Sequence, residues 1–167
     1  GRGFRAARTR TPGTPSSTAP GKPVDLLSLV DAKEDPVAGS WQVSGTKLRS
    51  RAGIHWHRVQ IPYIPPEEYD LILAVERKSG TNCLDIGLVS GGRPFVVELD
   101  GRITNDVCGL ALIDGLYSDQ NETGVKGPVL APSQPSVILC SVRKGGVSVT
   151  VGGEKIIDWK GASNRVS

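Results

Sequence analysis

The last quarter of the chain contains three runs rich in β-branched residues, separated by short glycine turns. Ser136–Arg143 is followed by Lys144-Gly145-Gly146, and Val147–Val151 is followed by Gly152-Gly153 and then Lys155–Trp159. Val, Ile and Thr favour extended strands, and paired glycines permit the positive φ angles of two-residue hairpin turns. The pattern therefore predicts a three-stranded antiparallel meander, which is typical of β proteins.

The middle of the chain repeats this strand-and-turn pattern. Tyr69–Arg77 places apolar residues at every second position, and Cys83–Val89 and Arg93–Leu99 flank Gly91-Gly92 as the two arms of a hairpin. No 12-residue segment has helical periodicity, so about nine or ten strands in an all-β, antiparallel two-sheet sandwich are expected. The shorter predicted strands are Ser40–Ser44, Lys47–Ser50, His57–Ile61 and Cys108–Ile113, and residues 24–30 predict a helical turn or an irregular edge strand.

The first 22 residues differ from the rest of the chain in charge and composition. They carry five basic residues and no acidic one, whereas residues 23–167 carry 15 basic and 17 acidic residues. The net charge of +3 therefore comes from this segment. Its Pro, Thr and Ser content and its few apolar side chains predict a disordered basic linker at 1–22. Five bases without interleaved aromatics do not indicate nucleic-acid binding.

The cysteines and the apolar runs exclude further classes of protein. Cys83, Cys108 and Cys140 are an odd set without a CxxC pair, which argues against a zinc site or a dense disulfide framework. Buried free thiols are expected, with one disulfide as the alternative. No apolar run approaches the ~20 residues of a membrane-spanning helix, so membrane insertion is not expected.

Four segments carry a resemblance to a known family. They are PVDLLSLVDAKEDPVAGSW, IPYIPPEEYDLILAVERKSG, GLALIDG and VRKGGVSVTVGGEKIIDWKG, spread over residues 23–167. They resemble the concanavalin A-like (laminin-G or glucanase) sandwich domains, nearest the 3-keto-disaccharide-hydrolase-like domains of planctomycete bacteria. The resemblance implies a jelly-roll sandwich, a fold that hosts enzymes, lectins and structural modules alike. Such domains usually continue beyond the DWKG turn, so we expect the 23–167 sandwich to be incomplete and another chain or segment to supply its last strands.

A catalytic role has one weak candidate pair. Glycosidases of this fold class place acids at alternate strand positions, and Glu98 and Asp100 have this spacing. The third acid of the usual pattern is replaced by Ile103, and Asp100-Gly101 also fits the start of a turn. A strand end with a turn aspartate is therefore the favoured interpretation.

The stretch His55-Trp56-His57 is the candidate for carbohydrate binding. An exposed Trp56 beside His57 would offer an aromatic face to a sugar ring. His55 and His57 share one face of an extended segment, but a metal would need a third ligand that is not evident nearby. A partly buried Trp with solvated histidines is the alternative.

The polar loop that follows residue 115 offers oxygen ligands. Asp114, Asp119, Asn121 and Glu122 could surround a Ca²⁺ ion, as some laminin-G-like domains do, although their spacing is not a recognised calcium loop. No cofactor is otherwise predicted.

Three functions remain open from the sequence. The first is a non-catalytic module that binds carbohydrate or protein within a larger surface or envelope protein, at an extracytoplasmic location. The second is a structural assembly subunit that a neighbouring chain completes by strand addition. The third is a glycoside hydrolase of the 3-keto-disaccharide type, which the resemblance allows. The scarcity of acidic motifs favours a protein that is not an enzyme.

Overall fold

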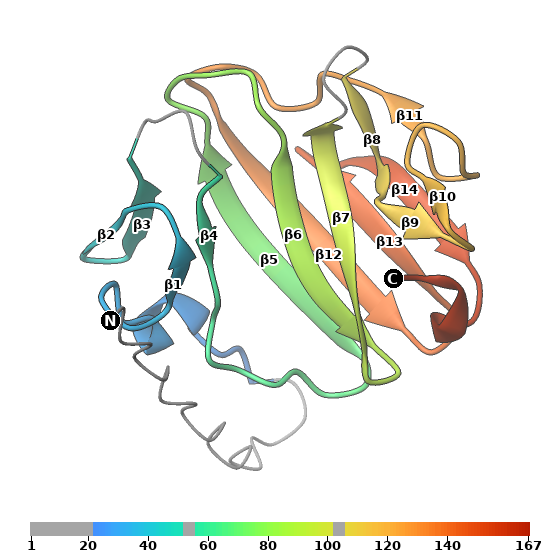
Figure 1. Ribbon diagram of the computed structural model, residues 1–167, viewed down its shortest axis with the longest axis horizontal. Coiled ribbons are helices and arrows are strands. Elements are labelled where there is room, and N and C mark those ends of the chain that lie inside the picture. Colours follow the sequence, from blue (N-terminus) through green and yellow to red (C-terminus); the bar gives the residue numbers. More distant parts are fainter. Residues whose placement is uncertain (1–21, 52–55, 102–105) are drawn as a thin grey trace, which may run out of the picture. The chain divides into compact units, whose positions relative to one another are not determined.

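The computed structural model describes residues 22–51, 56–101 and 106–167. The expected linker, apart from Lys22, lies outside these residues. The chain forms two compact units that divide after Ile64, and each is described by itself. Figure 1 gives the order of the elements. No helix among the described residues has the length and apolar character needed to cross a membrane.

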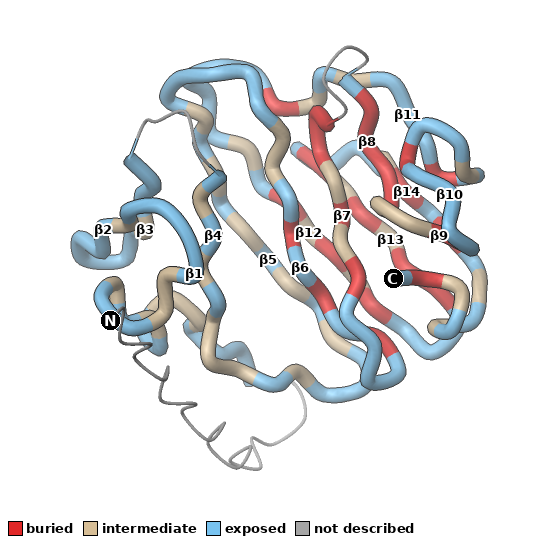
Figure 2. The backbone as a smooth tube through the Cα atoms, viewed as in Figure 1, coloured by how far each residue is buried: buried red, intermediate tan, exposed pale blue. Residues whose placement is uncertain are grey.

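The first unit contains short elements only. A 3₁₀ helix, η1 (Leu26–Leu29), begins where the Asp25 carboxylate accepts a hydrogen bond from the Leu27 N–H at 3.1 Å. The remaining elements are the paired strands β1 (Pro36–Ala38) and β4 (Arg58–Val59) and the hairpin β2 (Trp41–Ser44) and β3 (Lys47–Ser50). The predicted strand over residues 57–61 is thus reduced to two residues. None of the unit's described residues is buried, so these residues form no core of their own (Figure 2).

The second unit is built from two four-stranded antiparallel sheets, which we name after their edge strands. The β6–β11 sheet has the order β11-β8-β7-β6, and the β5–β14 sheet has the order β14-β13-β12-β5. A separate hairpin pairs β9 with β10. The strands are β5 (Tyr69–Glu76), β6 (Leu84–Ser90), β7 (Arg93–Gly101), β8 (Val107–Leu110), β9 (Leu112–Ile113), β10 (Leu116–Tyr117), β11 (Val125–Lys126), β12 (Pro135–Arg143), β13 (Gly146–Val151) and β14 (Glu154–Lys160), and the helix η2 (Ser163–Arg165) follows.

Tight glycine turns set the register of the hairpins. Gly91 and Gly92 have φ angles of 55° and 75°, and Gly152 and Gly153 have φ angles of 60° and 90°. Positive φ at both central residues is the requirement of the turn that matches the twist of two hairpin strands. The predicted hairpin over residues 83–99 and the predicted meander of β12, β13 and β14 are both confirmed.

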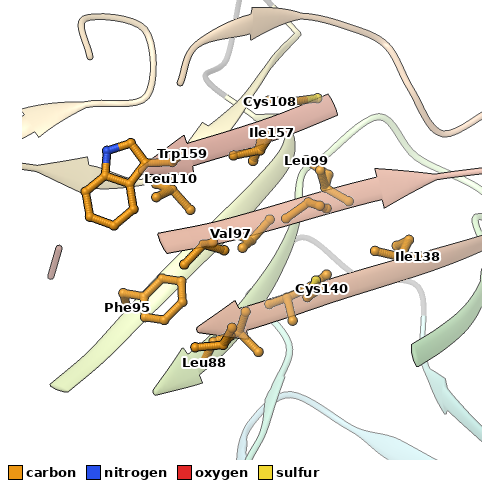
Figure 3. Packing of buried hydrophobic residues seen from close by; sticks show 14 of the residues in the cluster. Leu88, Phe95, Val97, Leu99, Cys108, Leu110, Ile138, Cys140, Ile157 and Trp159 are labelled. Carbon is orange, nitrogen blue, oxygen red and sulfur yellow. The ribbon is translucent and has the colours of Figure 1, made fainter. Parts of the chain in front are cut away.

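The core lies between these two sheets. Alternate residues of β7 and β12 are buried, and Figure 3 shows Phe95, Val97 and Leu99 in one cluster with Ile138 and Cys140. The opposite faces of the strands carry the exposed residues, as the period-2 pattern requires. The second unit is therefore an all-β, sandwich-like structure.

One side chain ties the edges of the two sheets together. The Tyr69 hydroxyl on β5 donates to the Val89 carbonyl at 3.0 Å and accepts from the Val89 N–H at 2.9 Å on β6. These backbone groups belong to an edge strand, which would otherwise offer them to another chain. The tyrosine thus closes part of the β6 edge.

A buried carboxylate holds the loop between β11 and β12. At Asp100 the register of β7 shifts and φ is 53°. Its carboxylate accepts hydrogen bonds from the N–H groups of Val129 and Leu130 at 2.7 and 3.1 Å, and the Arg77 guanidinium lies 3.2 Å from it. Because the Asp100 side chain is only 1% exposed, these partners replace the water that a charge needs.

Replacing Asp100 by Ala should lower the free energy of unfolding by about 3–5 kcal/mol, because the largely buried Arg77 would lose its counter-ion and two backbone N–H groups would lose their acceptor. Urea denaturation measures this quantity. Glu154→Ala, at an exposed position of β14, is the control and should change it by less than about 0.5 kcal/mol. A loss below about 1 kcal/mol for Asp100→Ala would contradict the structural role.

The buried thiol of Cys140 should make the free energy of unfolding fall at alkaline pH. All three cysteines are free, and burial raises the pKa of Cys140 from 9.0 to about 12. In the unfolded chain the thiol ionises near pH 9, so its contribution is complete below pH 9 and is lost as the pH rises towards 12. Between pH 8 and pH 11, wild-type protein should lose about 2–3 kcal/mol more unfolding free energy than Cys140→Val. Urea denaturation under reducing conditions tests this, and parallel losses would refute it.

Candidate functional site

The structure places the two candidate catalytic acids in different surroundings. Asp100 is buried and bound as described above. Glu98 is half-buried on the face of β7 that points away from the core, and its carboxylate accepts a hydrogen bond from the buried Ser118 hydroxyl at 2.5 Å. The residue directly opposite Glu98 is Asp85 on β6. The acid that converges with Glu98 is therefore Asp85, and its position follows from the register of the hairpin.

Cys83 completes a cluster with these two acids. One ligand atom from each of Cys83, Asp85 and Glu98 lies within 4.8 Å of the other two. Sulfur and carboxylate oxygen are both zinc ligands, so the cluster has donors that could hold a metal. Burial and then the neighbouring carboxylates raise the pKa of the Cys83 thiol to about 11, so a metal would have to displace its proton at neutral pH. The alternation of Cys83 and Asp85, combined with the Gly91-Gly92 turn, could have indicated this cluster from the sequence.

The carbohydrate candidates belong to the first unit. His55 lies outside the described residues. Trp56 is 74% exposed, so its ring faces are accessible. His57 is half-buried and meets Trp41 edge-on, with 6.3 Å between ring centroids, and among the described residues its Nδ1 has no hydrogen-bond partner. Of these two residues, therefore, only Trp56 has ring faces that are open for stacking on a sugar.

Two of the calcium candidates bind the same guanidinium group. The Asp114 carboxylate lies 2.7 Å from Arg165, and the Glu122 carboxylate lies 3.1 Å from the same group. Glu122 also accepts a hydrogen bond from the Trp159 indole at 2.9 Å, which is the main cause that lowers its pKa, and Arg165 adds to this effect. Asp119 lies in the same loop. The positive charge of Arg165 thus already compensates two of the predicted calcium ligands.

An apolar patch covers part of the solvent-facing side of the β5–β14 sheet. We define this apolar patch as Ile72, Ala74, Val137 and Leu139, which form the cross-strand pairs Ile72–Leu139 and Ala74–Val137 on β5 and β12. Ile72 is 68% exposed and Val137 is 55% exposed. Large aliphatic side chains grouped on neighbouring strands and open to water typically mark an interaction surface.

Polar groups surround the apolar patch. The Arg143 guanidinium binds the Asp70 carboxylate at 2.7 Å beyond one end, and Glu76 pairs with Lys78 beyond the other. Thr150 stands beside Leu139 on β13. An apolar centre with a polar rim is the arrangement of protein–protein interfaces.

Comparison with known proteins gives no match to a protein-family model, a curated protein or a solved structure.

The Cys83 cluster can be tested by the reactivity of the thiol. The double variant Asp85→Asn, Glu98→Gln removes two negative charges and should lower the pKa of Cys83, because those charges disfavour the thiolate. Alkylation by iodoacetamide at pH 8.5 should become about 3–10-fold faster, since thiolate is the reacting form. Peptide mass spectrometry follows Cys83 alone, with Asp158→Asn as control. An unchanged rate in the double variant would show that the carboxylates do not act on the thiol.

Proposed function

We propose that the second unit is a non-catalytic β-sandwich module that binds another protein through the apolar patch. The observation that carries the proposal is the exposure of Ile72 and Val137, which lie on the edge strand β5 and on its neighbour β12 in a four-stranded sheet. Burying the exposed part of these two side chains against a partner would contribute roughly 1–2 kcal/mol each. The module would belong to a larger surface or envelope protein.

The chemistry of the patch favours a protein over a carbohydrate as the ligand. Sugars are held by aromatic faces and by directional polar groups, whereas the patch is formed by aliphatic side chains. The polar rim, with the Asp70–Arg143 ion pair, suits an aliphatic partner surface bordered by charges of both signs. Carbohydrate binding is the second candidate, and the observation that favours it is the exposed Trp56.

We also propose that the second unit is a jelly roll of the concanavalin A-like type. Its support is the pair of four-stranded antiparallel sheets around one core and the closing meander of β12, β13 and β14. The contacts of two acidic candidates, Asp100 and Glu122, agree with a non-catalytic role. Asp100 is used in packing and Glu122 in binding Trp159 and Arg165.

A photo-cross-linking amino acid at position 137 would identify the partner in cells that make the parent protein. The partner would then be expressed and its Kd measured. Val137→Glu should weaken binding at least tenfold, or about 1.4 kcal/mol, because a carboxylate would be buried in an apolar contact.

Val89→Glu is the matched control, because Val89 is exposed on the other sheet, and it should bind within twofold of wild type. Unchanged affinity for Val137→Glu would refute the proposal. So would a glycan-array ligand whose binding is abolished by Trp56→Ala together with the absence of any protein cross-link.

A further inference from the structure

The free edge of β14 presents backbone groups that point away from its partner strand. Among the described residues, β14 pairs with β13 only. The Gly161 N–H donates to the Gly145 carbonyl at 3.1 Å, just outside the opposed pair Lys160–Gly146. In an antiparallel ladder, a hydrogen bond between the residues that flank an opposed pair shows that the opposed residues themselves are not hydrogen-bonded to each other. Lys160 and Gly146 are such a pair, so the N–H and C=O of Lys160 point away from β13, towards the free edge.

The same orientation recurs two residues earlier. Asp158 stands opposite Ser148, and the register between these pairs is regular, since the shift in this ladder lies between Val149 and Thr150. The N–H and C=O of Asp158 therefore also face the free edge. Two residues of β14 thus offer a repeating donor and acceptor pattern at the spacing of a β ladder.

A hollow of about 260 Å³ lies beside this edge. Its lining comes from β14 and from the segment that leads into β11, the edge strand of the other sheet. The apolar part is formed by Val125, Ile156, Ile157 and Trp159. The Trp159 ring is held by the hydrogen bond of its indole N–H to Glu122 and by the Arg165 guanidinium, 5.7 Å from the ring centroid. The hollow is therefore the opening between the two sheets on the β14 side.

We propose that the β14 edge binds an extended segment of a partner protein by strand addition, with an aliphatic side chain of that segment entering the hollow. A strand added next to β14 would continue the β5–β14 sheet and would bond to Asp158 and Lys160. Its inward side chains would alternate with outward ones and would enter the space between the sheets, where the hollow lies.

The size and chemistry of the hollow favour a peptide over a small free ligand. Its volume is below the ~300–1,000 Å³ of pockets for drug-sized molecules but suits one or two side chains. The charged side chains around it, Lys160, Asp158 and Glu122, are of both signs, so the apolar side chain would determine selectivity. The β6 edge is less suited, because Tyr69 already occupies the N–H and C=O of Val89.

A backbone variant tests the inference directly. In Asp158→Pro the missing N–H is one that faces the free edge, so the ladder to β13 keeps its bonds while strand addition is blocked. Asp158→Ala keeps the N–H and is the matched control. The probe is a phage-displayed library of linear 12-residue peptides panned on the wild-type chain, with the best peptides synthesised for Kd measurement.

The expected peptides alternate apolar and polar residues, bind Asp158→Ala within twofold of wild type and lose at least tenfold in affinity for Asp158→Pro. Val125→Arg, which brings a charge to the hollow, should weaken them as well. If Asp158→Pro does not show the circular dichroism spectrum of wild type, Lys160→Pro takes its place.

Equal binding to the proline variant, or a library that yields no binder, would overturn the inference. The inference does not rest on the apolar patch. Peptides that are sensitive to Asp158→Pro should be insensitive to Val137→Glu, so the two proposals can fail separately.

Discussion

Everything in the second unit depends on the burial of alternate side chains between two antiparallel sheets. Phe95, Val97 and Leu99 on β7 face the core at every second position, and Ile138, Cys140 and Val142 on β12 do the same. A slip of one residue in either ladder would turn each of these side chains towards water. The glycine pair at 91–92 opposes such a slip of β7 against β6, because it fixes where that hairpin reverses, and the pair at 152–153 fixes the reversal between β13 and β14 in the same way.

The same alternation decides what the surface can do. It places Ile72 and Val137 on the solvent-facing side and places Asp85 opposite Glu98. It also leaves the backbone of Asp158 directed outward from β14. Several polar groups are already engaged within the fold, since Asp100 holds Arg77 and the Asp114 and Glu122 carboxylates hold Arg165. Among the described residues of the second unit, the aliphatic face with Ile72 and Val137 and the outer edge of β14 are not engaged in this way, and our two proposals rest on them.

The strands with a regular period of two were predictable from the sequence, as were the hairpin over residues 83–99 and the closing meander. The predicted strand at 57–61 failed beyond Arg58–Val59, because its alternation is short and the unit that contains it buries none of its described residues. The segment after residue 115 was predicted as a polar loop, but it contains the short strands β10 and β11.

The arrangement of the candidate site was only partly predictable. Local spacing suggested a pair of Glu98 and Asp100, but a register shift with a positive φ at Asp100 sends that carboxylate to Val129 and Leu130, about 30 residues away in sequence. Likewise, Arg165 meets Asp114 across 51 residues. Such contacts depend on tertiary structure, which the pattern of neighbouring residues does not encode. The order of the strands within each sheet is also a tertiary property.

Hydroxyl-radical footprinting of the chain, alone and with the partner identified by cross-linking, measures whether the apolar patch is open to water and whether the partner covers it. Oxidation reports how far each side chain is open to water. We expect Ile72 and Val137 to be modified in the free chain and protected in the complex, while Val89 is modified equally in both. Unmodified Ile72 and Val137 in the free chain, or modification that the partner does not reduce, would contradict this expectation.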